Sequence, residues 1–204
     1  MIILSFDDCH IEGWAGMVMG GKSPKAMTFY VSDLAGVSPA RWQMLRDIEA
    51  AGHEIGFHGM RHLRADRPLD WDAFMRDEID EGLKIMESEG FIPAHYSYPY
   101  GAYSQESNRR LLERFKTLRA VNAGGLYRVG EMPSVWAAIE FDFDRKDRAV
   151  LCPREPGDVA CVFMHLPNPA RLALLMEMAA GNGEEFVTVS DAFSRISMPS
   201  KAST

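Results

Sequence analysis

Two histidines four residues apart, His58 and His62, follow an apolar, β-prone segment and are the side chains best suited to chemistry in this chain. Neutral imidazoles four apart on one helical turn share a face, close enough to bind one cation. Two histidines leave a site incomplete, and the best source of a third ligand is Asp7-Asp8, which ends the apolar segment 2–6. Two histidines and one carboxylate, with positions left open, are typical of a catalytic metal.

The composition is that of a soluble globular domain. The chain has 204 residues, 47% of them hydrophobic and 25% charged, which is ordinary for one large domain with a sizeable core. A formal net charge of −7 and scattered Lys and Arg residues argue against a nucleic-acid surface. No apolar run approaches the length of a membrane span, so we expect neither nucleic acid nor membrane as a partner.

The amino terminus and the cysteines favour a cytoplasmic protein. Met1 leads straight into a predicted strand without a charged leader or an apolar signal region, so a cytoplasmic location is expected if this is the natural start. Cys9, Cys152 and Cys161 are odd in number and widely spaced, which favours reduced thiols over a disulfide framework.

Strand and helix patterns alternate along the chain, which predicts parallel β/α units in one domain. Residues 198–204 are polar and predicted to be a frayed tail, leaving a catalytic domain over 1–197. The stretches 9–25 and 122–134 are rich in glycine and are predicted to be loops. Strands are predicted at 2–6, 27–31, 54–57, 94–98, 117–121, 135–143, 159–164 and 186–189, and helices at 38–51, 70–89, 104–115, 168–180 and 190–196.

Polar residues able to do chemistry follow four of these predicted strands. In a parallel β/α barrel the carboxyl ends of the strands share one face, and that face carries the active site. The distribution therefore predicts an enzyme. The residues are Asp7, Asp8, His58, Tyr100 and His165.

Four segments together resemble the polysaccharide deacetylases of carbohydrate esterase family 4, the chitooligosaccharide deacetylase homology group. Ser5-Phe6-Asp7-Asp8 is similar to the first motif of that family, and Gly52 to His62 is similar to the second. Tyr98-Pro99-Tyr100-Gly101 resembles the third motif, and Phe163-Met164-His165 stands in the place of the last. The resemblance covers roughly residues 2–196.

This resemblance implies an α/β fold, a distorted parallel (β/α) barrel of seven or eight strands in a single domain. It implies that Asp8, His58 and His62 hold a divalent metal, usually zinc and sometimes cobalt or nickel. Asp7 would be the general base and His165 the general acid. Pro99 and Tyr100 would contact the substrate, and the backbone N–H of Tyr100 would help bind the oxyanion.

The chain departs from the family pattern at two places that bear on the acid and the base. The third motif often carries an arginine two residues before the proline, which orients the base, and Ser97 stands there instead. The acidic residue that tunes the catalytic histidine is expected to be Asp142 or Asp144.

Several of these residues also have ordinary structural interpretations. Aspartates after a strand commonly cap a turn, and His165 could be a hydrogen-bonded core histidine. The acidic cluster Asp77, Glu78, Asp80 and Glu81 is interpreted as the solvated face of a helix rather than as a second metal site.

The expected activity is a metal-dependent hydrolase that removes an acetyl group from an N-acetylated amino sugar or oligosaccharide, or from another small acylated substrate. One alternative is a metal-free cyclic amidohydrolase of the same fold, as in the allantoinase-like branch. The other is a non-catalytic carbohydrate-binding relative. Loss of activity on chelation separates the first two, and a non-catalytic relative would bind sugar without releasing acetate.

Overall fold

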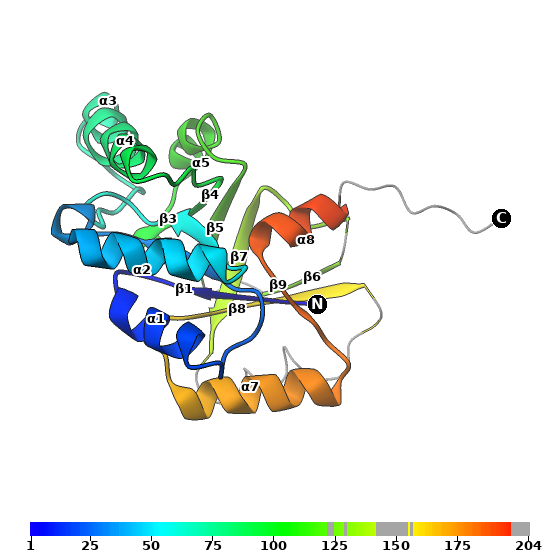
Figure 1. Cartoon of the computed structure of the whole chain (residues 1–204). Coiled ribbons are helices and arrows are strands. Elements are labelled where there is room, and N and C mark those ends of the chain that lie inside the picture. The colour runs from blue at the N-terminus through cyan, green and yellow to red at the C-terminus, as the bar shows by residue number, and fades with distance from the viewer. Residues whose placement is uncertain (122–124, 129, 142–154, 156, 197–204) are drawn as a thin grey trace.

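The computed structural model describes residues 1–121, 125–128, 130–141, 155 and 157–196, which fold around a closed barrel of seven parallel strands (Figure 1). The strands follow the order β1-β2-β3-β4-β5-β7-β8, and β8 pairs with β1 to close the ring. The predicted distorted β/α barrel is therefore confirmed. Its strands are β1 Ile2–Phe6, β2 Thr28–Val31, β3 Glu54–Phe57, β4 His95–Ser97, β5 Thr117–Val121, β7 Val135–Glu140 and β8 Asp158–Met164.

Two short strands extend the sheet beyond the ring. β9 (Phe186–Val187) pairs in parallel with β1, and β6 (Leu126–Arg128) pairs antiparallel with β8. The expectation of a loop throughout 122–134 was wrong at β6. Three residues are too few to give a sequence pattern, and it is the pairing with β8 that makes them a strand.

Helices lie around the outside of the barrel (Figure 1). Helices α1, α2 and α7 cover one side of it, and α3, α4 and α5 lie above them in the view. No helix of the described residues is long and apolar enough to cross a membrane. The helices are α1 Ile11–Met19, α2 Pro39–Ala50, α3 Trp71–Phe74, α4 Glu81–Ser88, α5 Gln105–Leu111, α7 Pro169–Gly181 and α8 Val189–Ile196, with short turns η1 Leu34–Gly36, η2 Met75–Asp80 and η3 Pro99–Gly101.

The prediction of a long loop over 9–25 was wrong, because residues 11–19 form α1. Glycine content favoured a loop, since glycine is a poor helix former. The helix forms because four residues at helical spacing are buried in the core against the barrel, namely Ile11, Trp14, Ala15 and Val18. Burial of that apolar face outweighs the propensity of the glycines.

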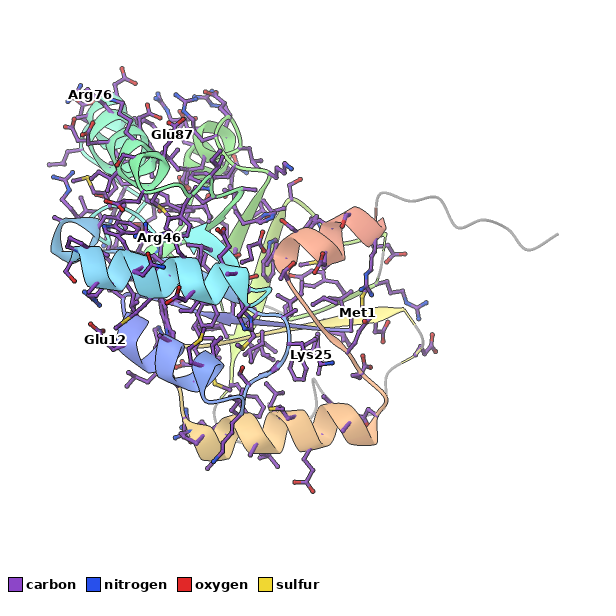
Figure 2. The ribbon with its side chains drawn as sticks, viewed as in Figure 1. Met1, Glu12, Lys25, Arg46, Arg76 and Glu87 are labelled. Atoms are coloured by element: carbon purple, nitrogen blue, oxygen red, sulfur yellow. The ribbon has the colours of Figure 1, made fainter. Side chains whose placement is uncertain are left out.

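The two faces of the strands carry different packing. Along β1, Ile2, Leu4 and Phe6 join the cluster of apolar residues beneath the helices, whereas Ile3 belongs to a second cluster. Because side chains alternate between the faces of a strand, Ile3, Ser5 and Asp7 point to the inside of the barrel. Charged side chains such as Arg76 and Glu87 stand on the outer, solvent-exposed surface (Figure 2).

Helix α8 closes the amino-terminal end of the barrel. The Ser190 backbone N–H donates to Glu54 at the start of β3, and Ser190 Oγ lies 2.9 Å from His95 Nε2 at the start of β4. The Val189 N–H donates to Thr28 at the start of β2. The opposite, carboxyl-terminal end is left for the site.

Candidate active site

The carboxyl ends of the barrel strands bring the candidate residues together around one pocket of about 300 Å³. Asp7 and Asp8 follow β1, His58 follows β3, and Glu140 ends β7. A pocket of this size lies at the lower end of the range for small-molecule sites. Its walls also include His62, Tyr98, Tyr100, Gly101, Val121, Phe163 and His165.

Asp8, His58 and His62 are spaced as the ligands of one metal ion would be. Asp8 Oδ1 lies 3.5 Å from His58 Nε2 and 3.3 Å from His62 Nε2, and the two Nε2 atoms are 3.1 Å apart. Zinc bonds of about 2.0–2.1 Å in tetrahedral geometry separate neighbouring ligand atoms by about 3.3 Å, so the donor set fits such an ion. Among the described residues this is the one group of at least three metal-ligating side chains found so close together.

His58 is held in the orientation that a metal ligand requires. Its side chain is 2% exposed, and its Nδ1 lies 2.8 Å from the backbone oxygen of Ser97 at the end of β4. A carbonyl only accepts, so Nδ1 carries the proton and Nε2 presents a lone pair toward Asp8. Ligating histidines are commonly fixed in this way by a partner on the other nitrogen.

His62 reaches the site from a loop, so the assumption that the two histidines share one helical turn was wrong. The loop bends back through Gly59 and His62, with φ of 86° and 60°. A Cβ at Gly59 would lie 2.7 Å from Glu78 Oε1, so a residue without a side chain is needed there.

Glu78, in the π-helical turn η2, holds that loop. Its Oε1 accepts the backbone N–H groups of Arg61 at 2.9 Å and Leu63 at 3.2 Å, on either side of His62. Its Oε2 accepts from Arg61 Nε at 3.1 Å. Glu78 is wholly buried, which corrects its assignment to a solvated acidic face. Sequence periodicity placed it wrongly because a π-turn shifts the register of the helix.

The electrostatics of the cluster suit a cation. The imidazoles of His58 and His62, whose Nε2 atoms face Asp8, hold the pKa of Asp8 well below its usual value, against the opposing effect of burial. The hydrogen bond to Asp8 raises the pKa of His62. Asp8 is therefore ionised and already committed to the two imidazoles.

Asp7 points the other way, into the barrel, and has a partner that sequence reasoning missed. The guanidinium of Arg119 on β5 donates through Nη2 to Asp7 Oδ2 and to Ser97 Oγ. Asp7 is 3% exposed, and its Oδ1 has no hydrogen-bond partner among the described residues. One carboxylate oxygen is thus fixed, the other has no partner among the described residues, and Asp7 itself lines the pocket.

His165 lies across the pocket with Glu140 beside it. His165 Nδ1 is 3.3 Å from Glu140 Oε1, and the imidazole meets the ring of Phe163 edge-on at 5.4 Å between centroids. Glu140 is therefore an acidic partner of His165 that the sequence did not single out. Asp142 and Asp144, which were expected in this role, lie outside the described residues.

Tyr100 forms the rim of the pocket. Its backbone has φ 59° and ψ 11°, the buried Pro99 precedes it, and its 65% exposed ring stands 4.6 Å from the ring of His62. Four non-glycine residues in the described part of the chain have positive φ, and three of them, Asp8, His62 and Tyr100, lie at this pocket. Such conformations concentrate at functional sites, where the surrounding structure must hold them in place.

A second, larger hollow of about 810 Å³ lies between α1 and α7. Its walls are mostly glycine and apolar residues, including Gly13, Met17, Leu172 and Met176, with Lys22 as the charged residue. Among the described residues no acid or histidine lines it, so they offer it no carboxylate or imidazole for acid–base chemistry or metal binding.

Comparison with known proteins agrees with this geometry. The sequence model described as polysaccharide deacetylase matches residues 1–116. A search of curated proteins finds no match.

Several solved structures share the fold. A family 4 acetyl xylan esterase from Clostridium thermocellum, solved with a cobalt ion, has a TM-score of 0.66 and 17% identity over 95% of this chain and 90% of its own. A peptidoglycan N-acetylglucosamine deacetylase has a TM-score of 0.66 and 17% identity over 95% of this chain and 87% of its own. A family 4 pseudoenzyme from Bacillus anthracis has a TM-score of 0.63 and 14% identity over 94% of this chain and 64% of its own.

Proposed function

The chain belongs to the polysaccharide deacetylase family, and we propose that it is a metal-dependent hydrolase that removes an acetyl group from an N-acetylated amino sugar or oligosaccharide. The observation that carries the proposal is that the ligand atoms of Asp8, His58 and His62 all lie within 4.8 Å of one another. These three residues line a pocket that Asp7 also lines. Two imidazoles and a carboxylate make an open site of the kind used in catalysis.

Asp8, His58 and His62 would hold the ion, zinc in the first place and cobalt or nickel as alternatives. A divalent metal at this position supplies polarisation of an acyl carbonyl and lowers the pKa of water to about 7. His58 fits the task because the Ser97 carbonyl fixes its tautomer, and His62 because Glu78 fixes its loop.

Asp7 is the general base of the proposed reaction. Asp8 is committed to His58 and His62, whereas Asp7 lines the pocket and its Oδ1 has no partner among the described residues. Oδ1 takes a proton from the attacking water, and proton transfer of this kind contributes about 10²–10⁴-fold.

His165 is the general acid. Its Nδ1 faces Glu140, which leaves Nε2 to carry the proton that the departing amine nitrogen needs. The backbone N–H of Tyr100 donates to the acyl oxygen as negative charge develops there. These roles divide nucleophile activation and leaving-group protonation between two residues that follow neighbouring strands, β1 and β8.

The proposed substrate is an acetylated carbohydrate. The names of the two similar enzymes refer to acetylated xylan and to N-acetylglucosamine of peptidoglycan. The exposed rings of Tyr100 and Tyr103 offer apolar faces on which a sugar can stack, and Pro99 supports the first of them.

Metal analysis combined with acetate release over a panel of acetylated sugars and oligomers tests the proposal. We expect about one divalent ion per chain, acetate release that stops on chelation, and recovery on adding zinc. Hydrolysis of a cyclic ureide or imide that survives chelation, without acetate release from the sugars, would favour the metal-free alternative. Sugar binding without any release would favour a non-catalytic relative, a possibility given weight by the structural likeness to a pseudoenzyme.

A further inference from the structure

Arg119 is a charged side chain sealed inside the barrel. It is wholly buried, and its guanidinium carbon lies 4.7 Å from the ring centre of Phe163 and 5.3 Å from that of Tyr30. Burying a cation is costly unless it is paired, and an apolar side chain of similar volume often serves stability as well or better. Packing alone therefore does not explain why an arginine stands at position 119.

The hydrogen bonds of Arg119 are directed at the catalytic end of the barrel. Nη2 donates both to Asp7 Oδ2 and to Ser97 Oγ. Nε and Nη1 have no hydrogen-bond partner among the described residues. The ion pair with Asp7 is thus the principal compensation for burying this charge.

We propose that Arg119 is the positioning residue for Asp7. This inference rests on the proposed function, because it concerns the orientation of the base in that reaction. Arg119 ties down Oδ2 and so leaves Oδ1 as the oxygen at the pocket. A carboxylate without this partner could rotate about its Cα–Cβ bond and turn either oxygen away from the water.

The strand register explains why the arginine comes from β5. Ser97 on β4 and Arg119 on β5 are paired residues in the parallel ladder. Ser97 has a short side chain, which leaves room for the guanidinium and accepts one of its hydrogen bonds. The rings of Phe163 and Tyr30 limit its rotation, so the planar guanidinium offers a fixed geometry that a lysine ammonium lacks.

The test compares Arg119→Gln and Arg119→Lys with the wild-type protein, all loaded with zinc. In Arg119→Gln we expect kcat to fall by about a hundredfold, KM to change by less than about threefold, and metal content to stay near wild type. Arg119→Lys keeps the charge near Asp7 and should recover about tenfold of the lost kcat. If Arg119 served packing alone, its substitution would not lower kcat selectively while leaving KM nearly unchanged. Arg119→Lys would then not restore part of the lost kcat.

A matched control and a milder variant accompany these proteins. Arg114 also pairs with an aspartate, Asp80, but on the surface away from the pocket, so Arg114→Gln should leave kcat unchanged. Ser97→Ala removes the hydroxyl that Arg119 contacts while keeping the carbonyl that holds His58, and should lower kcat by about three- to tenfold. It tests the same contact if Arg119→Gln does not fold.

Wild-type kcat in both Arg119→Gln and Ser97→Ala would overturn the inference. The inference would also be overturned if Arg119→Gln lost metal and thermal stability in proportion to its loss of kcat, and if Arg119→Lys restored none of these properties. If the zinc-loaded wild type releases no acetate, the proposed function fails by itself. Crystal structures then decide the inference, because Asp7 should change rotamer in Arg119→Gln, and an unmoved Asp7 would refute it.

Discussion

The two sides of the pocket are built differently. On the metal side, His58 is almost wholly buried against the Ser97 carbonyl, and the loop of His62 is fixed by the buried carboxylate of Glu78. On the acid side, His165 and Glu140 contact each other, but their side chains are 43% and 52% exposed.

This difference fits the roles proposed for the two sides. Metal ligands must converge before the ion arrives, so each is held by a partner on its far side. A proton donor must meet the leaving group and then regain a proton from solvent, which an exposed imidazole can do. The match to the polysaccharide deacetylase sequence model ends at residue 116, so it covers the metal side and stops before Arg119, Glu140 and His165.

The largest expected effect is on the metal side. His58→Ala should lower metal affinity by well over a hundredfold and abolish turnover, because loss of a ligand costs more than the about 10–100-fold typical of an outer-shell partner. Asp7→Asn is the control, with metal near one per chain but turnover down about 10³-fold. Calorimetry with zinc and acetate release measure both, and full metal content in His58→Ala would show that the ligand assignment is wrong.

His165→Ala probes the opposite side. We expect kcat to fall by about 10²–10³-fold with zinc affinity unchanged, because in the proposed reaction the imidazole protonates the leaving nitrogen and does not bind the ion. Substrates whose leaving group needs no proton, such as 4-nitrophenyl acetate, should be much less affected. Equal losses on aryl esters and on N-acetyl sugars would contradict the role of a general acid.

Glu78→Gln tests whether the metal side depends on its buried support. An amide keeps the shape but weakens acceptance of the Arg61 and Leu63 N–H groups, so zinc affinity should fall about tenfold. Asp77→Asn is the matched control, since the Asp77 side chain pairs with exposed Arg76. Unchanged zinc affinity in Glu78→Gln would mean that the loop holds His62 without help.

The smallest effect is expected at Glu140. Glu140→Gln leaves a hydrogen-bond acceptor 3.3 Å from His165 Nδ1 but removes its charge, so kcat should fall less than about tenfold without any change in zinc affinity. A loss as large as that of His165→Ala would mean that the acid side is as tightly organised as the metal side. Rates of hydrolysis of N-acetyl sugars and of aryl esters, measured for Glu140→Gln and His165→Ala, distinguish these two outcomes.

Local patterns were sufficient for the β/α units and for the edge that carries the candidate residues, and the family resemblance added the barrel. Alternating strands and helices predicted parallel β/α units, and Asp8, His58 and Tyr100 each lie within three residues after the end of a strand, so their position at one edge follows from the topology. The same reasoning failed for α1, where the buried spacing of Ile11, Trp14, Ala15 and Val18 outweighed the glycines around it.

The sequence by itself determined the fold class and the candidate residues, because strand periodicity and short motifs act over a few neighbouring positions. Only the tertiary structure decided their partners: Arg119 for Asp7, Glu78 for the loop of His62, and Glu140 for His165. These pairs are separated by 112, 17 and 25 positions, respectively, and carry no motif. Strand order and register bring the first and third pairs together at the barrel, and the packing of η2 against the loop brings the second together.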